Sequence, residues 1–537
     1  MPYPNGLDLP GGFRIRIIRT ALAALAVVCL LSVYCTQRRS IIITPDILLV
    51  GRDSLSFTIQ AEGLPAPSQI IPINNGLKSP LNYTAGRHST WLTLFYRGTT
   101  PDTIFVFATS KDLLAGDYVD TVTVSADDAS GSPKDVIVRM TVIRGIKTGP
   151  SGIKVSVLIG APELSQTAFV VAPTGGGTML YRIDEAVPWL TLSRSQGVAR
   201  DTLIVSFNTG GFSRGTYADS MKVTAAEAAN SPLTVPCSLS VHIWAAQFQN
   251  SNYGMRGIRM FPDSSGVAVG FKRTVLGTDG YVFRTTDAGR TWVPKFLVRG
   301  SVLNGINFSD NQHGWVYGAK SAVFVTNNGG VDWTATYGGL NGTVVDFEEP
   351  SIDTLYMVED DGTFLRSDDN GASWTNYAVP SSTPLTGGKF INGLTGWVIG
   401  DAGKIFYTQD GGASWRRDST NTSSDLRDIV MIDSSTGYIV GDEGTILVRI
   451  QGSKWVPQQS MTSERLMTLF FLNRQTGWIA GDGGTLLRTD DGGHNWRLLN
   501  SETPLELFGV SFLDAKRGWI AGEEGLISTT LNGGEDR

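Results

Sequence analysis

Glycine and aspartate crowd one stretch near the C-terminus, GDGGTLLRTDDGGHNW at 481–496. Three kinds of chemistry suit this composition: backbone N–H groups of a glycine-rich loop can cradle a phosphate, carboxylates can coordinate calcium, or Asp and Gly can shape a turn. The second half of the stretch recurs, as TTDAGRTW (285–292), TNNGGVDW (326–333), SDDNGASW (367–374), TQDGGASW (408–415) and TDDGGHNW (489–496). Five regular copies of one pattern are not five active sites, so the repetition favours the turn.

The copies share the pattern Ser/Thr-x-Asp-x-Gly-x-Thr/Ser-Trp, the Asp-box. We expect the acid to accept hydrogen bonds from N–H groups of its own hairpin, the glycine to supply a positive φ, and the indole ring to be buried beside the neighbouring repeat. The Asp and Trp positions hold Asp287 and Trp292, Asn328 and Trp333, Asp369 and Trp374, Asp410 and Trp415, and Asp491 and Trp496. A shortened copy, RIQGSKW, keeps Trp455 and has no Asp. We predict no catalytic residue, metal or cofactor here.

The spacing of the aromatic residues identifies the elements that carry the boxes. The box tryptophans, including Trp455, are 41, 41, 41, 40 and 41 residues apart. A second aromatic series repeats the same intervals, through Trp315, Tyr356, Trp397, Tyr438, Trp478 and Trp519. Each repeat contains four short strand patterns, and four strands in about 41 residues are typical of a β-propeller blade.

The two ends of this region predict how the ring closes. Adding 41 to Trp496 gives position 537, the last residue, so the seventh box is cut off before its Trp. HIWAAQFQN, from His242, matches the strands that open with the box Trp elsewhere, with Trp244 in the anchor position. We therefore expect residues 244–250 to complete the last blade beside strands from about 506 to 530. This gives a seven-bladed propeller over 244–537, with no exposed sheet edge.

One set of equivalent acidic residues could form a functional surface. The residue after the second strand is acidic in blades three to seven: Asp360, Asp401, Asp442, Asp482 and Glu523. Blades one and two have Phe271 and Ala319 there. On one face of a propeller these acids would form an incomplete arc that suits a cation or a basic partner. The alternative is that Asp before x-Gly is simply good turn chemistry.

Two related modules precede the propeller, at 41–145 and 151–243. TWLTL with Trp91 aligns with PWLTL with Trp189, 98 residues later, and GDYVDTVTVSA aligns with GTYADSMKVTA at 99 residues. Short alternating strands in units of this length predict immunoglobulin-like β-sandwiches, with both tryptophans in the cores. The shared pattern resembles the BACON-type bacterial Ig-like domain, which is often found with carbohydrate-active partners. The whole chain is thus expected to be all-β.

The N-terminus has the pattern of an export signal. Three arginines precede a fourteen-residue apolar segment, ALAALAVVCLLSVY, which is too short to span a membrane as a helix. LSVYC resembles a bacterial lipobox, so residues 1–35 are expected to be a lipoprotein signal peptide with lipidation at Cys35. Tyr34 departs from that pattern. We predict an exported outer-membrane lipoprotein that faces the periplasm or the cell surface, with secretion or an uncleaved anchor as alternatives.

Composition excludes several classes of function. The 537 residues contain 44 Lys and Arg against 50 Asp and Glu, a formal charge of −6, which argues against nucleic acid as a partner. With four His and three Cys, neither a zinc site nor a disulfide framework is easily built.

The full blade pattern, as in GWVIGDAGKIFYTQDGGASW and GWIAGDGGTLLRTDDGGHNW, resembles the photosystem II assembly and stability factor family of cyanobacteria and chloroplasts. The resemblance covers 244–537 and implies a seven-bladed propeller that binds an assembling membrane protein without catalysis. Asp-box propellers also include sialidases and xyloglucan-degrading enzymes. The FRIP signature of the sialidases is absent from the propeller, and the xyloglucan enzymes use a cleft between two propellers.

We therefore expect a non-catalytic protein-binding or assembly-scaffold protein of the bacterial cell envelope. Its partner is a protein or a surface glycan, its only membrane attachment is the lipid anchor, and the protein is a monomer. The alternatives are a carbohydrate-active propeller, which binds or cleaves glycans, and a structural adhesion role.

Overall fold

Buried and exposed side chains alternate along the strands of the N-terminal half, as the period of two in the sequence predicts. In β8 (Lys134–Ile143), for example, Val136, Val138, Met140 and Val142 are buried while the residues between them are exposed. The computed structural model describes residues 45–77, 79–161, 166–184, 187–208, 210–337, 342–351, 353–452 and 454–536. Apart from two short 3-10 turns, the regular elements of these ranges are β-strands, which confirms the all-β prediction.

Two compact units make up the chain, the first up to Arg144 and the second containing nearly everything after it. The first unit is a β-sandwich with sheets in the order β1-β3-β6-β5 and β2-β8-β7-β4. Its strands are β1 (Leu48–Val50), β2 (Ser54–Gln60), β3 (Gln69–Asn75), β4 (Thr84–Gly86), β5 (Leu92–Phe95), β6 (Asp102–Ala108), β7 (Gly116–Ser125) and β8. Trp91 lies in the core between the sheets, and the hydroxyl of Tyr118 donates a hydrogen bond to the carbonyl of Leu114 at the corner before β7.

The second sandwich repeats this design with sheets in the order β13-β15-β11-β9 and β10-β17-β16-β12-β14. Its strands are β9 (Gly145–Gly149), β10 (Ile153–Leu158), β11 (Gln166–Thr174), β12 (Leu180–Asp184), β13 (Leu190–Leu192), β14 (Gln196–Val198), β15 (Asp201–Phe207), β16 (Gly215–Thr224) and β17 (Leu233–His242). Trp189 and Cys237 lie in its core, and Tyr217 makes the equivalent corner bond to Ser213.

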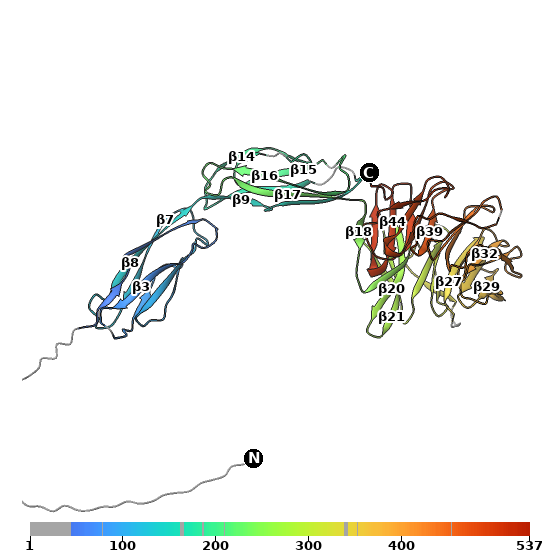
Figure 1. The fold of residues 1–537 in the computed structure, drawn as a ribbon, viewed down its shortest axis with the longest axis horizontal. Helices are drawn as coiled ribbons and strands as arrows, with labels where there is room; N and C mark the ends of the chain where they lie inside the picture. Colours follow the sequence, from blue (N-terminus) through green and yellow to red (C-terminus); the bar gives the residue numbers. More distant parts are fainter. Residues whose placement is uncertain are drawn as a thin grey trace, which may run out of the picture. The chain divides into compact units, whose positions relative to one another are not determined.

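The rest of the second unit is a ring of seven four-stranded antiparallel sheets over the described part of 245–530, which confirms the seven-bladed propeller (Figure 1). Blades 1 to 3 are β19 (Tyr253–Met260), β20 (Gly266–Thr274), β21 (Gly277–Thr285), β22 (Val293–Val298); β23 (Leu303–Phe308), β24 (Gly314–Gly318), β25 (Val323–Thr326), β26 (Thr334–Tyr337); and β27 (Val344–Ser351), β28 (Thr354–Glu359), β29 (Thr363–Ser367), β30 (Thr375–Ala378).

Blades 4 to 6 are β31 (Leu385–Phe390), β32 (Gly396–Gly400), β33 (Lys404–Thr408), β34 (Arg416–Asp418); β35 (Leu426–Met431), β36 (Gly437–Gly441), β37 (Ile446–Arg449), β38 (Val456–Gln458); and β39 (Leu466–Phe471), β40 (Gly477–Gly481), β41 (Leu486–Thr489), β42 (Arg497–Leu499). Blade 7 combines β43 (Leu507–Phe512), β44 (Gly518–Gly522) and β45 (Ile527–Thr530) with β18 (Ala245–Phe248). The 3-10 turns are η1 (Asp482–Gly484) and η2 (Glu523–Gly525).

The two aromatic series of the sequence meet at the interfaces between blades. The box Trp residues share core clusters with the second-series residue of the preceding blade, as Trp496 does with Tyr438 and Trp455 with Trp397. The exception is Trp333, which clusters with Val267 because blade 1 has no aromatic residue there. The same relation closes the ring, because Trp292 of blade 1 clusters with Trp519 of blade 7. An aromatic wedge every 41 residues is therefore what keeps adjacent blades at a fixed spacing.

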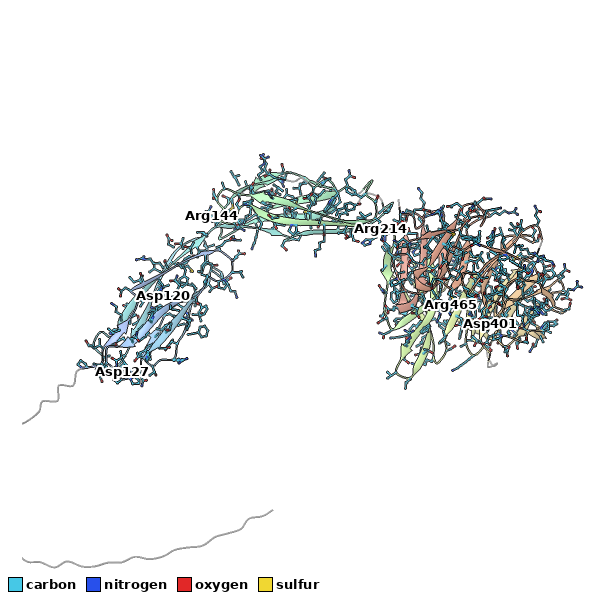
Figure 2. All side chains as sticks on the ribbon, viewed as in Figure 1. Asp120, Asp127, Arg144, Arg214, Asp401 and Arg465 are labelled. Carbon is cyan, nitrogen blue, oxygen red and sulfur yellow. The ribbon has the colours of Figure 1, made fainter. Side chains whose placement is uncertain are left out.

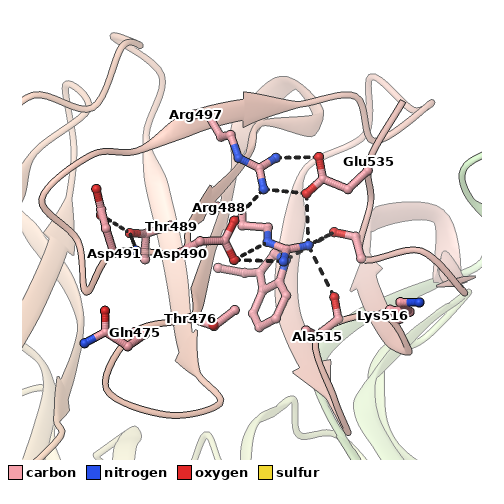
Figure 3. A network of polar contacts seen from close by, with 12 residues as sticks. Gln475, Thr476, Arg488, Thr489, Asp490, Asp491, Arg497, Ala515, Lys516 and Glu535 are labelled. Atoms are coloured by element: carbon pink, nitrogen blue, oxygen red, sulfur yellow. Dashed lines mark hydrogen bonds and ion pairs between the residues drawn. The ribbon is translucent and has the colours of Figure 1, made fainter. Parts of the chain in front are cut away.

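Both ends of the propeller contribute to blade 7, as predicted. β18 pairs antiparallel with β45, and Trp244 is 4% exposed, in one cluster with Trp478 and Phe512. The C-terminal segment is held from blade 6: Arg488 lies 3.0 Å from the carboxylate of Glu535, and Arg497 donates to the same carboxylate (Figure 3). Closure thus rests on strand pairing, an indole anchor and an ion-pair network.

The predicted signal peptide and Cys35 lie outside the described residues. Over the ranges given above, the model contains no helix with the length and apolar character needed to cross a bilayer.

Replacing Trp244 by Ala should lower the free energy of unfolding of the propeller by about 3–5 kcal/mol, the usual cost of removing a buried Trp. Hydrogen exchange should show lost amide protection in β43–β45, although the substitution lies some 260–290 residues earlier in the chain. Protection in β31–β34 is the internal control. Loss of protection confined to residues 244–250 would contradict closure by both ends.

Candidate functional site: the mouth of the propeller channel

The box carboxylates are occupied within their own hairpins. Asp369 accepts hydrogen bonds from the backbone N–H of Ser373 at 2.8 Å and from the hydroxyls of Ser373 and Ser367. These bonds, led by the Ser373 hydroxyl, lower the pKa of Asp369 to about 2. The same pattern holds at Asp287, Asp410 and Asp491 and, with an amide oxygen, at Asn328.

The seventh box is present, with Trp244 as its indole, as the sequence predicted. Asn532 lies two residues after Thr530 in the last blade, accepts a hydrogen bond from the Thr530 hydroxyl at 2.8 Å, and is followed by Gly534 with a positive φ. A Cβ on Gly534 would lie 3.2 Å from the ring of Trp244, as one on Gly330 would lie 3.4 Å from Trp333. Trp244 therefore completes a box whose other residues are at the opposite end of the chain, and Asn532 takes the place of the box Asp, as Asn328 does in blade 2.

The first strands of the blades surround a central cavity of about 620 Å³. At one of its mouths each of these strands contains a β-bulge, at the step between Met255 and Gly257 in blade 1 and at the equivalent step in the other six. A bulge adds one residue that has no partner on the neighbouring strand, and it changes the direction in which that residue's side chain points. The seven bulge residues line the cavity: Arg256, Asn304, Val345, Thr386, Arg427, Met467 and Phe508.

The bulge explains a glycine that recurs at the end of the second strand. A Cβ on Gly441 would lie 2.3 Å from the carbonyl oxygen of Asp425, the residue two before the bulge, and five other blades show the same conflict. Blade 3 is the exception: it has Glu359 there, buried, with a hydrogen bond from Ser321. Burial raises the pKa of Glu359. The bulge frame is therefore fixed by glycine in six blades, while the bulge residue itself varies.

The predicted acidic arc is partly neutralised by arginines. Arg427 binds both oxygens of Asp442 at 2.7 Å and lies 3.9 Å from Asp401, and Arg465 binds Asp482 at 2.9 Å. Figure 2 labels Asp401 and Arg465 on the propeller. The other two acids of the arc are not paired with an arginine. Asp360 accepts a hydrogen bond from the backbone N–H of Thr343. Glu523 lies close enough to Arg256 to interact electrostatically, but it has no ion pair within 4.0 Å among the described residues.

A second group of charges lies deeper in the channel. Lys389 of blade 4 donates to both carboxylate oxygens of Glu348 at 2.8 and 2.9 Å. Asp346 accepts the backbone N–H of Gly388, and Asp428 accepts that of Leu469, so each of these acids ties its first strand to that of the next blade. Burial raises the pKa of Asp428 to about 6 and, together with the negative charge of Glu348, that of Asp346 to about 8.

The lining of the channel mixes cationic, apolar, amide and carboxylate side chains, and the carboxylates of Asp346 and Asp428 accept backbone N–H groups. In the described part of the chain, no three His, Cys, Asp or Glu side chains are grouped in a way that could hold a metal ion.

The bulge frame can be tested with two glycines. Gly441→Ala should lower the free energy of unfolding by about 1–3 kcal/mol, because its Cβ meets a carbonyl oxygen that only a backbone shift can move. Gly387→Ala is the matched control: its Cβ would lie 3.6 Å from Ile399, an ordinary contact, and should change stability by less than about 1 kcal/mol. Equal effects in urea unfolding would contradict the bulge account.

Asp346 should make stability depend on pH. Its folded pKa of about 8 lies above the ordinary 3.8, so the folded state retains a proton that the unfolded state releases between those values. The stabilisation is therefore complete below pH 4 and is lost as the pH rises to about 8. Asp346→Asn cannot ionise, so its stability relative to the parent protein should rise with pH across this window.

Urea unfolding at a series of pH values measures this difference. Asp369→Asn, at a carboxyl whose pKa is about 2, should give a difference that is flat near neutral pH. A flat difference for Asp346→Asn as well would contradict the assignment.

Part of the propeller matches a known protein family. Residues 387–450 and 448–537 match the family model of the photosynthesis system II assembly factor YCF48. A search of the curated proteins found no match. Among solved structures, the chain is similar to one described as "YCF48 bound to D1 peptide" (20% identity, 54% of this chain, 96% of that chain, TM-score 0.45) and to YCF48 from Cyanidioschyzon merolae (17%, 54%, 98%, 0.44). It is also similar to the WD40 β-propeller domain of Doa1 (12%, 53%, 97%, 0.42).

The family match falls within blades 4 to 7, which contain four of the bulges described above. The resemblance seen in the blade pattern is thereby confirmed for residues 387–537: this part of the propeller is a segment of YCF48-like repeats.

Proposed function

We propose that the propeller is a non-catalytic module that binds another protein, and that the chain acts as an assembly scaffold in the bacterial cell envelope. The observation that carries this proposal is the set of seven bulge residues. They include two arginines, one Asn, one Thr and three apolar side chains, and all line one mouth of the channel. Variable side chains on a frame held rigid by glycine and aromatic wedges are how repeat scaffolds set specificity.

The hydrogen bonds of the channel carboxylates support a role in holding the frame for binding. Asp442 and Asp482 are held by arginines, and Asp346 and Asp428 accept backbone N–H groups of neighbouring strands. The match of residues 387–537 to an assembly-factor family adds independent support for a protein partner.

The cellular setting is proposed from the sequence. The export signal and the lipobox-like LSVYC place the chain in the envelope with a lipid on Cys35. The two sandwiches then act as a stalk between the anchor and the propeller, and their resemblance to BACON-type domains suits an envelope protein. A partner of this scaffold is accordingly an envelope protein.

Site-specific photo-crosslinking in the native cells tests the proposal. A photoreactive phenylalanine analogue at Asn304 or Met467, both bulge positions, should give an adduct with one defined protein. The same analogue at Val456, which is 52% exposed on the outer strand β38, is the matched control and should give none.

Two results would overturn the proposal. One is an adduct pattern that is equal at the mouth and at Val456. The other is no adduct at the mouth together with binding of the purified protein to a glycan array or cleavage of chromogenic glycosides, which would establish the carbohydrate-active alternative.

A further inference from the structure

Blade 1 differs from the other six in one hairpin. The interval from Arg256 to the equivalent Asn304 is 48 residues, against 40 or 41 between the other bulge residues. The additional residues lengthen β20 and β21, which pair beyond Phe271 through Lys272 with Asp279, Arg273 with Thr278 and Thr274 with Gly277. Figure 1 shows this hairpin reaching beyond the neighbouring strands of the propeller. We call residues 271–280 the arm.

The tip of the arm is apolar and fully exposed. Val275 and Leu276 have relative exposures of 105% and 100%, the highest of the large exposed hydrophobic residues in the described ranges. The ring does not need them, because blades 4 to 7 make the same connection with a short turn of the Asp-Ala-Gly-Lys type at 401–404. Apolar surface that the fold does not require marks an interaction site.

Cationic side chains lie between the tip of the arm and the mouth of the channel. The guanidinium of Arg273 lies 5.4 Å from the ring centre of Phe271, and that of Arg256 lies 5.3 Å from the same ring and 4.0 Å from Phe508. Lys272 lies 5.3 Å from the ring of Tyr253. In the part of the chain that the structure describes, none of these three cations has a carboxylate within 4.0 Å. Aromatic rings hold them in place and leave their charge available.

The acidic arc lies at the same mouth. Blades 3 to 7 have acids where blade 1 has Phe271, and Glu464 and Glu524 add carboxylates without an ion pair among the described residues. Glu523 and Glu524 lie in blade 7, beside blade 1, while Asp401, Asp442 and Asp482 lie near Arg427 and Arg465. The arm is therefore a cationic, apolar patch beside an acidic arc that arginines partly neutralise. A surface of this kind discriminates between partners by charge.

We infer that the arm docks the protein partner by inserting Val275 and Leu276 among apolar side chains that are flanked by carboxylates. This rests on the proposed function, which places a protein at the mouth. An anionic lipid surface is broad, so it would face the acidic arc as well as the arm and be repelled. A peptide segment is narrow enough to contact the arm alone, and the cations Lys272 and Arg273 then favour a segment that is acidic and amphipathic.

A random-peptide library displayed on phage, selected on the purified full chain, tests the inference. The selected peptides should carry Leu, Ile or Phe beside Asp or Glu. A synthetic peptide of the selected sequence should bind V275S/L276S at least about tenfold more weakly than the parent chain. K272E/R273E should weaken binding and flatten its dependence on salt, because fewer charges are then paired.

Matched controls come from exposed outer strands of the same ring. Val456→Ser removes an exposed apolar side chain from β38, and R416E/R417E reverses an adjacent exposed pair in β34. Both should bind the peptide as the parent chain does. Since the arm residues are exposed, circular dichroism and the unfolding midpoint of the arm variants should also match the parent chain.

Five results would overturn the inference. The selected peptides could bind arm variants and the parent chain equally, or could lack acidic residues. Phosphatidylglycerol vesicles could bind the chain through the arm, which would make the occupant a lipid surface. Sedimentation could show a dimer that V275S/L276S abolishes, which would make the occupant a second copy of the chain.

The Asn304 crosslink distinguishes failure of the inference from failure of the proposed function. If the crosslink persists in V275S/L276S, the arm inference fails and the proposed function stands. If the parent chain gives no crosslink at Asn304, the proposed function itself fails.

Discussion

The pairing of β18 with β45 is the constraint on which the propeller depends. Without it, blade 7 would have three strands and an exposed edge, and the wedge between blades 6 and 7 would lack its indole. Trp244 fills a box whose Thr530, Asn532 and Gly534 come from the other end of the chain. Closure also fixes the diameter of the channel. Adjacent blades are held at a similar spacing by a buried Trp, so a closed ring of seven blades has one diameter.

In the propeller, the residues that stabilise the fold are different from the residues that line the mouth of the channel. The acids and glycines of the boxes look like ligands in the sequence, yet their hydrogen bonds end within single hairpins. The bulge in the first strand of each blade, by contrast, presents a side chain to the channel. It brings one side chain per blade to a common mouth, and the antiparallel pairing continues on both sides with its register shifted by one residue. The sequence at that position can therefore change while the frame stays constant.

Periodicity made most of the fold predictable. The 41-residue intervals of two aromatic series correspond to a physical contact, since every box Trp except Trp333 clusters with the second-series residue of the blade before it. The strand that opens with Trp244 could be assigned to the last blade because its pattern matched the other box strands. Periodicity also indicated the last box, in which Asn532 takes the place of the Asp and Trp244 supplies the indole.

The site was less accessible to sequence reasoning. Equivalent positions placed Asp401, Asp442 and Asp482 on one face, but their pairing with arginines joins residues from different strands and different loops. A bulge has no strong sequence signature of its own. The glycine at the end of the second strand accompanies it in six blades, but blade 3 has Glu359 at that position. The long arm of blade 1 was visible as a 48-residue interval, but only the structure shows that its apolar tip is fully exposed.

A disulfide across the seam tests ring closure most directly. Ala246 and Ser528 are partners in the β18–β45 ladder, so cysteines at these two positions, in a chain whose Cys29, Cys35 and Cys237 are replaced, should form an intramolecular bond under mild oxidation. Mass spectrometry should recover the two peptides joined, and the unfolding midpoint of the propeller should rise. If both cysteines stay reduced, or join only between molecules, the two chain ends do not share a blade.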